Sequence, residues 1–434
     1  MPAFDAVVIG AGPAGNAAAI TLAKGGAKVL QVERGKAPGE KNLMGGVIYS
    51  SSLSPIVPNF WQSAPLERPV TEQNYWVTDG GSVAKFGFAD SAFAESEDGP
   101  ANAYTVLRAP FDKWMAGEAK KAGAMLLPAT VVTDLLMEEG RVVGVATDRP
   151  NGEIPAKIVI SGEGVNAFAS WKAGFGKRPD PSEVALVVKE VIELPQGVLE
   201  ARFGVGAGEG KTFEIFGDIT QGCLGYAFLY TNKNTVSVGV GGLVTDFADL
   251  KLASYELLEN VKNHSVVRPL LEGGKTLEYG GHLIPEGGYT SLPPLVSDGF
   301  LMTGDAALMV NAVHREGSNF AFASGRMAGE AALEAIASDD LSAKGLSGYR
   351  TRLEDSFILK DLKSYEGVFP FFRSRRDIME DYPAIMTDAL RSLFTVDGTA
   401  KGQKKKDLVK AVFKAKRPLA LLSDLYKMWR VLGK

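Results

Sequence analysis

The sequence predicts an α/β protein that has a parallel-sheet domain, an antiparallel β-sheet domain interleaved with it, and a helical C-terminal region. Three observations support this prediction. Residues 4–33 alternate strand, helix and strand, residues 184–241 hold β-branched runs separated by turn residues, and residues 346–434 have mostly helical spacing. No low-complexity linker is present, so we expect segments far apart in the sequence to complete the first domain.

Length and composition limit the class of protein. The chain has 434 residues, enough for two or three domains, and 45% hydrophobic with 23% charged residues is typical of a globular protein. The single cysteine, Cys223, excludes an internal disulfide and cannot ligate an iron–sulfur cluster alone. The apolar stretch 6–23 follows Asp5 and is interrupted by glycine and proline, so we expect neither a signal peptide nor a membrane span.

The predicted domains follow one another in a nested order. We expect residues 1–180 to form the first part of the parallel-sheet domain, with a small sheet inserted at 66–100. Residues 181–290 should form the antiparallel sheet, and residues 291–345 should close the first domain. Residues 346–434 should be helical with a basic tail, and Pro370 and Pro383 are expected to break these helices.

A glycine motif lies between the first predicted strand and helix. Gly10 suits the turn, Gly12 lets the backbone approach a pyrophosphate, and Gly15 lets helix and strand pack closely, with Ala14 in the first helical turn. Glu33 ends the next strand and can accept hydrogen bonds from both hydroxyls of a ribose. The pattern predicts a Rossmann-like dinucleotide site but leaves FAD and NAD open.

A second motif, about 290 residues later, favours FAD. Gly304 and Asp305 follow a short apolar strand and precede a predicted helix, where the aspartate can bind ribityl hydroxyls. Together the two motifs resemble those of glutathione-reductase-like flavoproteins. Residues 161–166 resemble a mid-chain element of the hydroxylase-like branch, but Glu163 stands where aspartate is commoner, which weakens a hydroxylase interpretation.

Further FAD contacts are expected on loops near these motifs. Arg108, at the start of a predicted helix, matches an arginine that in this branch reaches toward FAD, although a surface arginine is the alternative. The other candidate FAD-binding residues are Arg34, Asn42, Gly45, Gly46, Gly317, Ser318 and Asn319.

The sequence has little acid–base apparatus for bond-breaking chemistry. It lacks a cysteine pair, and its three histidines are separated in the sequence, so we assign no catalytic residue and no metal ligand. The remaining interpretation is electron transfer or hydride relay by a flavin. His314 and Arg315 could stabilise negative charge on the reduced ring, or belong to a polar loop that caps a helix.

Several segments together resemble the FixC family, which is related to electron-transferring-flavoprotein:quinone oxidoreductase. They are residues 40–46, 104–108, 226–233, 277–288, 304–307 and 314–319. The resemblance implies an FAD that accepts electrons from a FixA/FixB-type electron-transfer flavoprotein and passes them to a quinone, in an electron-bifurcation complex that supports nitrogen fixation. Because Cys223 is alone, the iron–sulfur cluster should belong to a ferredoxin-like FixX subunit.

The same resemblance implies a quinone channel lined by Tyr279, Gly280, Gly281 and Gly287. Tight turns in a structural sheet are the alternative explanation of these glycines.

The C-terminal tail differs in charge from the rest of the chain. From Lys401 onward the chain has eleven basic residues and two acidic ones, Asp407 and Asp424, which gives this part a net charge of +9. Because the whole chain has a net charge of −4, the rest of the chain carries −13. Apolar residues between Leu408 and Trp429 interleave with these charges. We expect the tail to contact a membrane surface or a partner subunit, or to pack on its own domain. The protein is expected to be cytoplasmic, peripheral on the inner face of the cell membrane, without a nucleic-acid partner.

Three other functions stay open on the same fold. They are an isoprenoid-saturating reductase of the geranylgeranyl type, a flavin monooxygenase, and an FAD-binding subunit with only a structural role.

Overall fold

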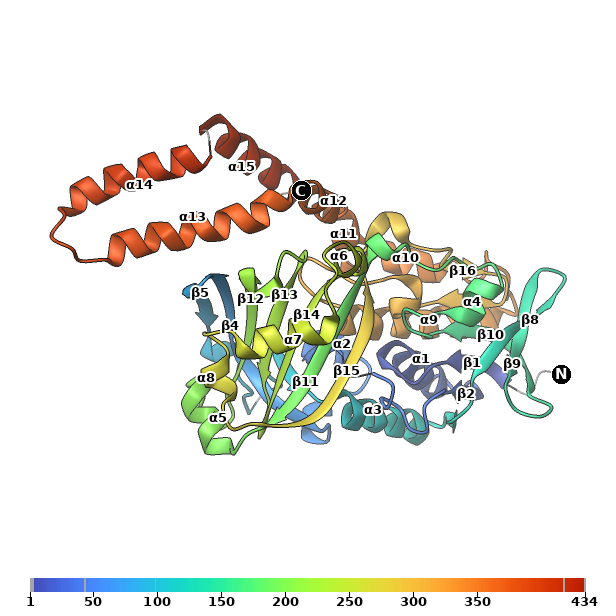
Figure 1. The fold of residues 1–434 in the computed structure, drawn as a ribbon. Helices are drawn as coiled ribbons and strands as arrows, with labels where there is room; N and C mark the ends of the chain where they lie inside the picture. Colours follow the sequence, from blue (N-terminus) through green and yellow to red (C-terminus); the bar gives the residue numbers. More distant parts are fainter. Residues whose placement is uncertain (1–3, 43, 98, 417, 433–434) are drawn as a thin grey trace. The chain divides into compact units, whose positions relative to one another are not determined.

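The chain forms two compact units, each built from three separate segments (Figure 1). The computed structural model describes residues 4–42, 44–97, 99–416 and 418–432. Unit 1 comprises Met1–Pro69, Ala92–Val184 and Gly280–Lys363, and unit 2 comprises Val70–Ser91, Ala185–Tyr279 and Ser364–Lys434. This division explains why no linker separates domains in the sequence.

Unit 1 is built on a mainly parallel sheet with the strand order β16-β17-β10-β1-β2-β7. Its strands are β1 (Phe4–Ile9), β2 (Val29–Val32), β7 (Met125–Leu127), β10 (Glu153–Ser161), β16 (Val296–Ser297) and β17 (Phe300–Met302). Strand β1 pairs in parallel with β2 and β10, and β10 pairs in parallel with β17. The late segment near residue 300 therefore completes the sheet begun by β1, as the sequence predicts. An antiparallel pair, β8 (Val132–Glu138) and β9 (Arg141–Thr147), extends β10.

The helices of unit 1 pack closely because small residues line them. The long helices are α1 (Pro13–Lys24), α3 (Arg108–Ala122) and α9 (Ser318–Ser338). A Cβ atom at Gly325 of α9 would lie 2.2 Å from the carbonyl oxygen of Ala14, so glycine is needed where α9 meets α1. Shorter helices are α2 (Ser50–Leu53), α4 (Phe168–Lys172), α10 (Gly348–Asp355) and α11 (Phe357–Ser364), and β3 (Val47–Tyr49) pairs with β6 (Ala103–Val106).

Unit 2 is built on a sheet with the order β15-β11-β14-β13-β12-β4, with β5 paired to β4. The strands are β4 (Leu66–Asp79), β5 (Ser82–Ala89), β11 (Val184–Glu193), β12 (Gly210–Gly217), β13 (Gly225–Thr231), β14 (Thr235–Leu243) and β15 (Lys275–Pro285). The four strands from β11 to β14 form the antiparallel sheet that the sequence predicts. Helix α7 (Ser254–Asn263) covers β14 with three buried residues, Leu257, Leu258 and Val261, and the shorter helices of this region are α5 (Gln196–Phe203), α6 (Val244–Asp249) and α8 (Arg268–Leu271).

The β4–β5 hairpin differs from the expected position. Its antiparallel register, with Asp79 opposite Ser82, matches the predicted small sheet at 66–100. From Val70 onward, however, β4 pairs in parallel with β12, so the hairpin belongs to unit 2 rather than to an insertion in the first domain. Parallel pairing of strands far apart in the chain leaves no local sequence signal.

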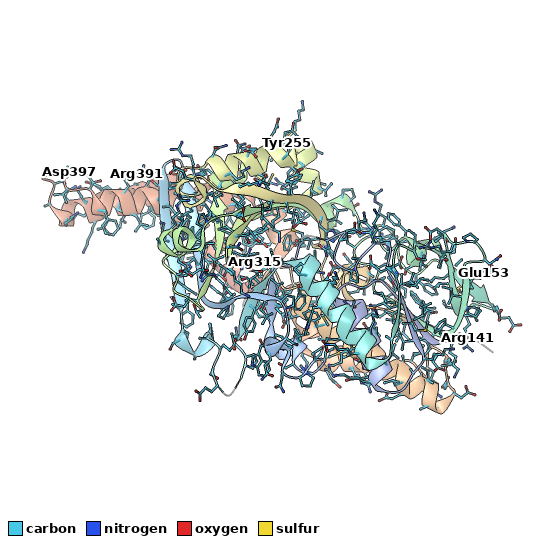
Figure 2. The ribbon with its side chains drawn as sticks, turned by 90° about the horizontal axis from the view of Figure 1, so that it is seen from below. Arg141, Glu153, Tyr255, Arg315, Arg391 and Asp397 are labelled. Carbon is cyan, nitrogen blue, oxygen red and sulfur yellow. The ribbon has the colours of Figure 1, made fainter. Side chains whose placement is uncertain are left out.

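The C-terminal helices also belong to unit 2. They are α12 (Val368–Ser374), α13 (Arg376–Phe394), α14 (Lys401–Ala415) and α15 (Pro418–Leu432). Helix α13 packs on β12 and β5, and α14 returns beside α13 (Figure 1). Arg391 and Asp397 mark the outer end of α13 in Figure 2. No helix of the described ranges combines the length and the apolar character that a bilayer crossing requires.

The expectation that Pro383 breaks a helix is wrong. Helix α13 continues through Pro383, where proline removes one backbone hydrogen bond of the helix. Hydrogen bonds to the β4–β5 hairpin hold the helix beyond this point, since the Thr387 hydroxyl donates to Asp79 at 3.1 Å and Arg391 donates to Ser82 at 2.7 Å. Pro370 lies in the first turn of α12, where proline is tolerated, so it does not break that helix either.

Candidate functional site

The glycine motif of unit 1 forms the tight turn that the sequence predicts. Gly10 has φ +94° at the end of β1, and a Cβ atom there would lie 2.4 Å from the carbonyl oxygen of Gly162. A Cβ atom at Gly15 would lie 2.0 Å from the Gly10 carbonyl oxygen. By contrast, a Cβ atom at Gly12 would meet no atom within 4 Å. The first turn of α1, which includes Ala14, therefore begins beside open space, where its amide groups can receive an anion.

Glu33 lies beside this turn at the end of β2. One carboxylate oxygen accepts the Ala11 amide at 2.8 Å and the other accepts the Gly35 amide at 2.7 Å. These bonds fix the carboxylate next to the glycine turn, and its remaining lone pairs can accept ribose hydroxyls. The next residue, Arg34, is exposed. Its positive charge contributes to the lowered pKa of His282, so Arg34 lies near that histidine.

Arg108 is buried, so the surface alternative for this residue is wrong. It is 4% exposed at the start of α3, and its guanidinium contacts both oxygens of Asp112 at 2.9 and 2.7 Å. A third bond runs to the Met44 carbonyl at 2.5 Å. Burial raises the pKa of Asp112, whereas Arg108 acts in the opposite direction. Sequence reasoning missed Asp112, although its spacing four residues after Arg108 on a helix could have indicated the pair.

The loop before β3 is shaped by glycine at the point where it passes Arg108. Gly45 has φ +86°, and a Cβ atom there would lie 2.7 Å from the Arg108 guanidinium and 2.9 Å from the Ser318 hydroxyl. Asn42 accepts the Met44 amide at 2.8 Å, and the Gly46 carbonyl accepts the Val106 amide at 2.9 Å. Gly45, Arg108 and Ser318 are thus brought together, while Asn42 and Gly46 shape the backbone around them.

The late glycine–aspartate pair is joined to helix α9. Gly304 has φ +60°, and its amide bonds the Ser324 hydroxyl at 3.1 Å. Asp305 is not the ordinary helix N-cap that the sequence left open, because Thr303 occupies that position. Burial raises the pKa of Asp305 to about 6, and the positive charge of Arg108 opposes the rise. Sequence segments nearly 200 residues apart therefore meet here.

A compact loop carries the predicted flavin-tuning residues into α9. Asn311 and Glu316 exchange two backbone bonds of 3.0 Å, and the His314 amide bonds the Asn311 side chain at 3.1 Å. Arg315 has φ +59°, a left-handed conformation that is uncommon for a residue with a side chain. The loop ends at Gly317, the N-cap of α9.

Asn319, in the first turn of α9, has an unused acceptor. Its amide nitrogen donates to Glu316 at 3.0 Å, but its buried Oδ1 has no partner among the residues that the structure describes. A buried acceptor of this kind is suited to a donor group of a bound molecule.

The predicted quinone residues lie on and after β15. Tyr279, Gly280 and Gly281 are inside this strand, so the alternative that they form tight turns is wrong. Tyr279 is 51% exposed. Gly287 follows the strand, and a Cβ atom there would lie 2.2 Å from the Ser291 hydroxyl.

Two titratable residues of this segment escaped sequence reasoning. Burial, together with the charges of Arg108 and Arg34, lowers the pKa of His282 to about 4, so this histidine is neutral near pH 7. Burial raises the pKa of Glu286 to about 8. Sequence alone gives no signal for these shifts because they come from neighbours distant in the chain.

Glu163 has a structural role. Its carboxylate accepts the Ala169 amide at 3.0 Å and the Ser161 hydroxyl at 2.9 Å, so it holds the end of β10 against α4. In the described part of the chain, no three His, Cys, Asp or Glu side chains are grouped as a metal site would require.

Comparison with known proteins identifies the family. Residues 5–174 match the FAD dependent oxidoreductase family, and residues 369–433 match the ETF-QO/FixC family C-terminal domain. Protein FixC of Bradyrhizobium diazoefficiens is 44% identical over 430 residues, which cover 98% of each chain. The chain belongs to the FixC family. Protein FixC of Escherichia coli K12 is 40% identical over 92% of each chain.

Solved structures with the same fold are flavoenzymes or resemble them. A geranylgeranyl bacteriochlorophyll reductase-like protein from Thermoplasma acidophilum has a TM-score of 0.72 at 20% identity, covering 97% of this chain and 99% of that one. The flavin-dependent brominase Bmp2 has a TM-score of 0.66 at 17% identity, covering 95% and 99%. At such identities the likeness shows the fold alone.

This FixC-family protein is an FAD-dependent oxidoreductase that acts in electron transfer. Its residues suit the cofactor in three places. The space beside Gly12 can receive a pyrophosphate, and Glu33 can bind a ribose. Gly45 leaves room for the Arg108 guanidinium and the Ser318 hydroxyl, two polar groups that can contact the cofactor. The prediction of FAD is confirmed, while the roles of the individual residues stay predictions.

Proposed function

We propose that this protein accepts electrons from a FixA/FixB-type electron-transfer flavoprotein and passes them to a quinone, in a complex that supports nitrogen fixation. The observation that carries the proposal is the near end-to-end identity with Protein FixC at 44%. The ETF-QO/FixC match at residues 369–433 adds a C-terminal region of the same family.

FAD supplies reversible two-electron chemistry when bound, and the residues of unit 1 hold and tune it. Glu33 orients the adenosine end, the first turn of α1 binds the pyrophosphate, and Gly304 with Asp305 lies where ribityl hydroxyls bind. Arg108 is held by Asp112 and the Met44 carbonyl, so it cannot move when a cofactor enters. Gly317, Ser318 and Asn319 present the start of α9 to the ring.

Arg315 stabilises negative charge on the reduced cofactor in this proposal, with His314 beside it. Arg315→Ala should lower the FAD midpoint potential by about 30 mV, the equivalent of about 1.4 kcal/mol for a two-electron couple. The measurement is a spectroscopic redox titration, with Arg326→Ala on the middle of α9 as the control, because Arg326 bonds the nearby Glu330 instead. An unchanged potential in Arg315→Ala would contradict the role.

Electron flow to a quinone takes place beside β15 in this proposal. Gly280 and Gly281 have no side chain to keep a flat ring from the backbone, and Tyr279 offers an exposed aromatic side chain. Gly287 leaves room for the Ser291 hydroxyl beside it. The iron–sulfur cluster belongs to a FixX-type ferredoxin-like partner, because Cys223 is buried and cannot ligate a cluster alone.

The experiment follows flavin absorbance in the purified protein. Addition of reduced FixA/FixB-type flavoprotein should bleach the flavin, and a soluble quinone analogue should restore its colour. A flavin that stays oxidised with the reduced partner would contradict the proposal and favour a structural role. Reduction of an isoprenoid double bond without quinone activity would favour the geranylgeranyl-type alternative, and oxygen consumption with NAD(P)H would favour a monooxygenase.

A further inference from the structure

Glu286 is a half-buried residue that the FAD site does not use. Its Oε2 atom is inaccessible to water and has no hydrogen-bond partner within the described ranges of the chain. The backbone around it is fixed, since its amide donates to the Glu183 carbonyl at 2.7 Å. An unsatisfied buried oxygen is rare in folded proteins and indicates a function or a missing partner.

The surroundings of Glu286 keep it protonated near neutral pH. Burial raises the pKa of Glu286 to about 8, and the positive charge of Arg315 opposes the rise. The carboxylate of Glu183, on the neighbouring segment, is engaged by the Ser291 hydroxyl at 2.9 Å. Glu286 is therefore an acid that can give up a proton at physiological pH, with Arg315 near enough to stabilise the resulting carboxylate.

Arg315 connects Glu286 to the FAD site. It lies in the loop that leads directly into Gly317, Ser318 and Asn319, and Figure 2 marks its position. Glu286 also directly precedes Gly287, one of the residues predicted to line the quinone channel. Glu286 is thus one residue away from a predicted quinone residue, and its carboxyl group interacts electrostatically with an arginine of the loop that leads into the FAD site.

Two other half-buried groups of the same region cannot supply a proton. The pKa of His282 is lowered to about 4, so this ring carries no extra proton at pH 7. The pKa of Asp305 is about 6, so its carboxyl is mostly ionised there. Of these three groups, Glu286 alone is mostly protonated when the protein works near neutral pH.

We propose that Glu286 is the proton donor for quinone reduction, an inference that rests on the proposed function. A quinone becomes a quinol by gaining two electrons and two protons. FAD, if bound as its reduced anion, would supply both electrons and one proton. The second proton comes from Glu286, whose O–H bond breaks as an O–H bond forms on the quinone oxygen. Arg315 stabilises the carboxylate, which regains a proton from bulk solvent because the residue as a whole is only half-buried, although Oε2 itself is covered.

The test compares two electron acceptors in Glu286→Gln. Ferricyanide accepts electrons without protons, so its reduction by the photoreduced protein should be unchanged. Reoxidation by a soluble quinone should slow about 100-fold, the lower end of the range for a general acid. Equal slowing with both acceptors, or normal quinone reduction, would overturn the inference. Failure of the wild-type protein to reduce quinone would overturn the proposed function and this inference together.

Glu183→Gln is the matched control, because it neutralises a carboxyl of the neighbouring segment while its side chain can still accept the Ser291 hydroxyl. Both acceptors should react normally in this variant. A quinone-specific loss in Glu183→Gln equal to that in Glu286→Gln would mean that any charge change here disturbs the site, and the inference would fail.

Two measurements on the wild-type protein do not depend on the fold of a variant. The quinone rate should fall as pH rises through about 8, because the donor loses its proton, while the ferricyanide rate stays level. An infrared difference spectrum between pH 7 and pH 9, recorded without quinone, should show a carboxylic acid band disappearing. A level quinone rate across this range, or the absence of that band, would overturn the assignment.

Discussion

Single residues decide how the polar groups of the cofactor site are held. Gly45 combines a left-handed φ with contact on both sides, to the Arg108 guanidinium and the Ser318 hydroxyl. Asp112 orients Arg108 through two hydrogen bonds. A substitution at Gly45 should affect FAD binding, and breaking the Arg108–Asp112 pair should affect stability.

Gly45→Ala should weaken FAD binding about tenfold or more, because a Cβ atom would clash with Arg108 and Ser318 and the backbone would be strained. The measurement is FAD affinity by fluorescence titration. Gly26→Ala is the matched control, since Gly26 has nearly the same φ, +84°, but a Cβ atom there meets nothing within 4 Å. Equal loss of affinity in both variants would show that backbone strain, rather than the cradle, is responsible.

Arg108→Ala should destabilise the FAD-free protein by about 3–5 kcal/mol, since it leaves the fully buried carboxyl of Asp112 without its partner. Urea unfolding measures the change. Adding Asp112→Asn should recover part of the loss, because the buried group is then neutral. If the two losses add instead, the pair is not coupled as its geometry indicates.

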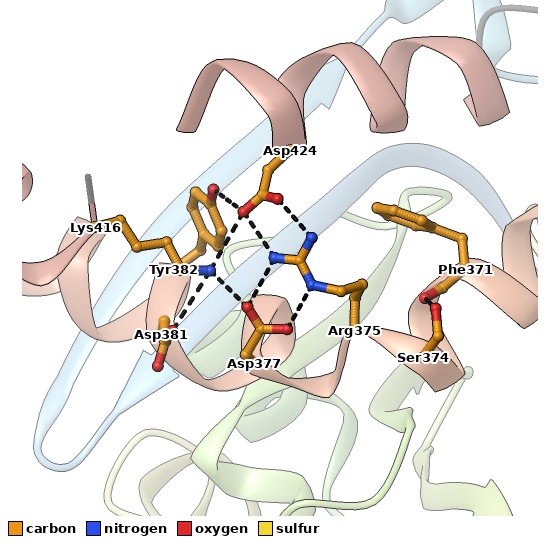
Figure 3. Close-up of polar contacts among 8 residues, drawn as sticks. All are labelled: Phe371, Ser374, Arg375, Asp377, Asp381, Tyr382, Lys416 and Asp424. Carbon is orange, nitrogen blue, oxygen red and sulfur yellow. Dashed lines mark hydrogen bonds and ion pairs between the residues drawn. The ribbon is translucent and has the colours of Figure 1, made fainter. Parts of the chain in front are cut away.

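At the scale of elements, a cluster of charged side chains holds α15 to the start of α13 (Figure 3). Asp424 of α15 is 2% exposed at its side chain and accepts two bonds from Arg375, at 2.6 and 2.9 Å. Arg375 also binds Asp377, and Lys416 binds Asp377 at 2.8 Å and Asp424 at 3.4 Å. The Tyr382 hydroxyl donates to Asp424 at 3.0 Å. The helix is thus held by ionic bonds as well as by packing.

Asp424→Asn should loosen α15 by about 2 kcal/mol, the scale of a hydrogen bond to a charged group. Hydrogen exchange of the α15 amides measures this local opening. Asp388→Asn should leave the exchange unchanged, because its pair with Arg391 is exposed at both ends.

The same contacts set a pH limit for α15. Its partners lower the pKa of Asp424 and of Asp377 below their usual range. Their stabilisation is therefore present above the unfolded-state pKa of about 4 and is lost as pH falls through the lower folded-state values. The protection factors of the α15 amides, which compare each exchange rate with its intrinsic rate at the same pH, should stay level between pH 8 and pH 5 and fall only below about pH 4. A fall in protection near pH 6 would contradict this assignment.

At the scale of the whole molecule, the basic C-terminal region presents an apolar surface. Leu419 is 81% exposed, Trp429 is 67% exposed, and Leu422 and Tyr426 are exposed between them at helical spacing on α15. The alternative expectation, a tail packed on its own domain with a solvated outer face, is compatible with this exposure, because α15 contacts α12 and Asp424 pairs with Arg375 at the start of α13. Arg417 and Lys434, two of the eleven basic residues, lie outside the described residues.

The double variant Leu422→Ser with Trp429→Ser should bind vesicles that contain anionic lipid at least tenfold more weakly. The reason is that burial of apolar surface contributes about 25 cal/mol of binding free energy per Å², and the variant has less apolar surface to bury. Co-sedimentation measures the binding. The control is Tyr255→Ser on α7, which removes an exposed aromatic side chain outside the C-terminal tail. Unchanged vesicle binding together with lost binding of the FixX-type partner would assign the surface to that subunit instead.

The local pattern of the sequence determined the glycine turn, the place of Glu33 at the end of the next strand and the late Gly304–Asp305 pair, because each depends on residues close together in the chain. The two motifs taken together, far apart in the sequence, indicated the cofactor. Only the tertiary structure decided that Arg108 is buried against Asp112, that β4 pairs in parallel with β12 and that α13 continues through Pro383. It alone also set the protonation of Glu286. Burial and pairing are properties of neighbours brought together by folding, and a residue's own sequence context does not specify which neighbours those are.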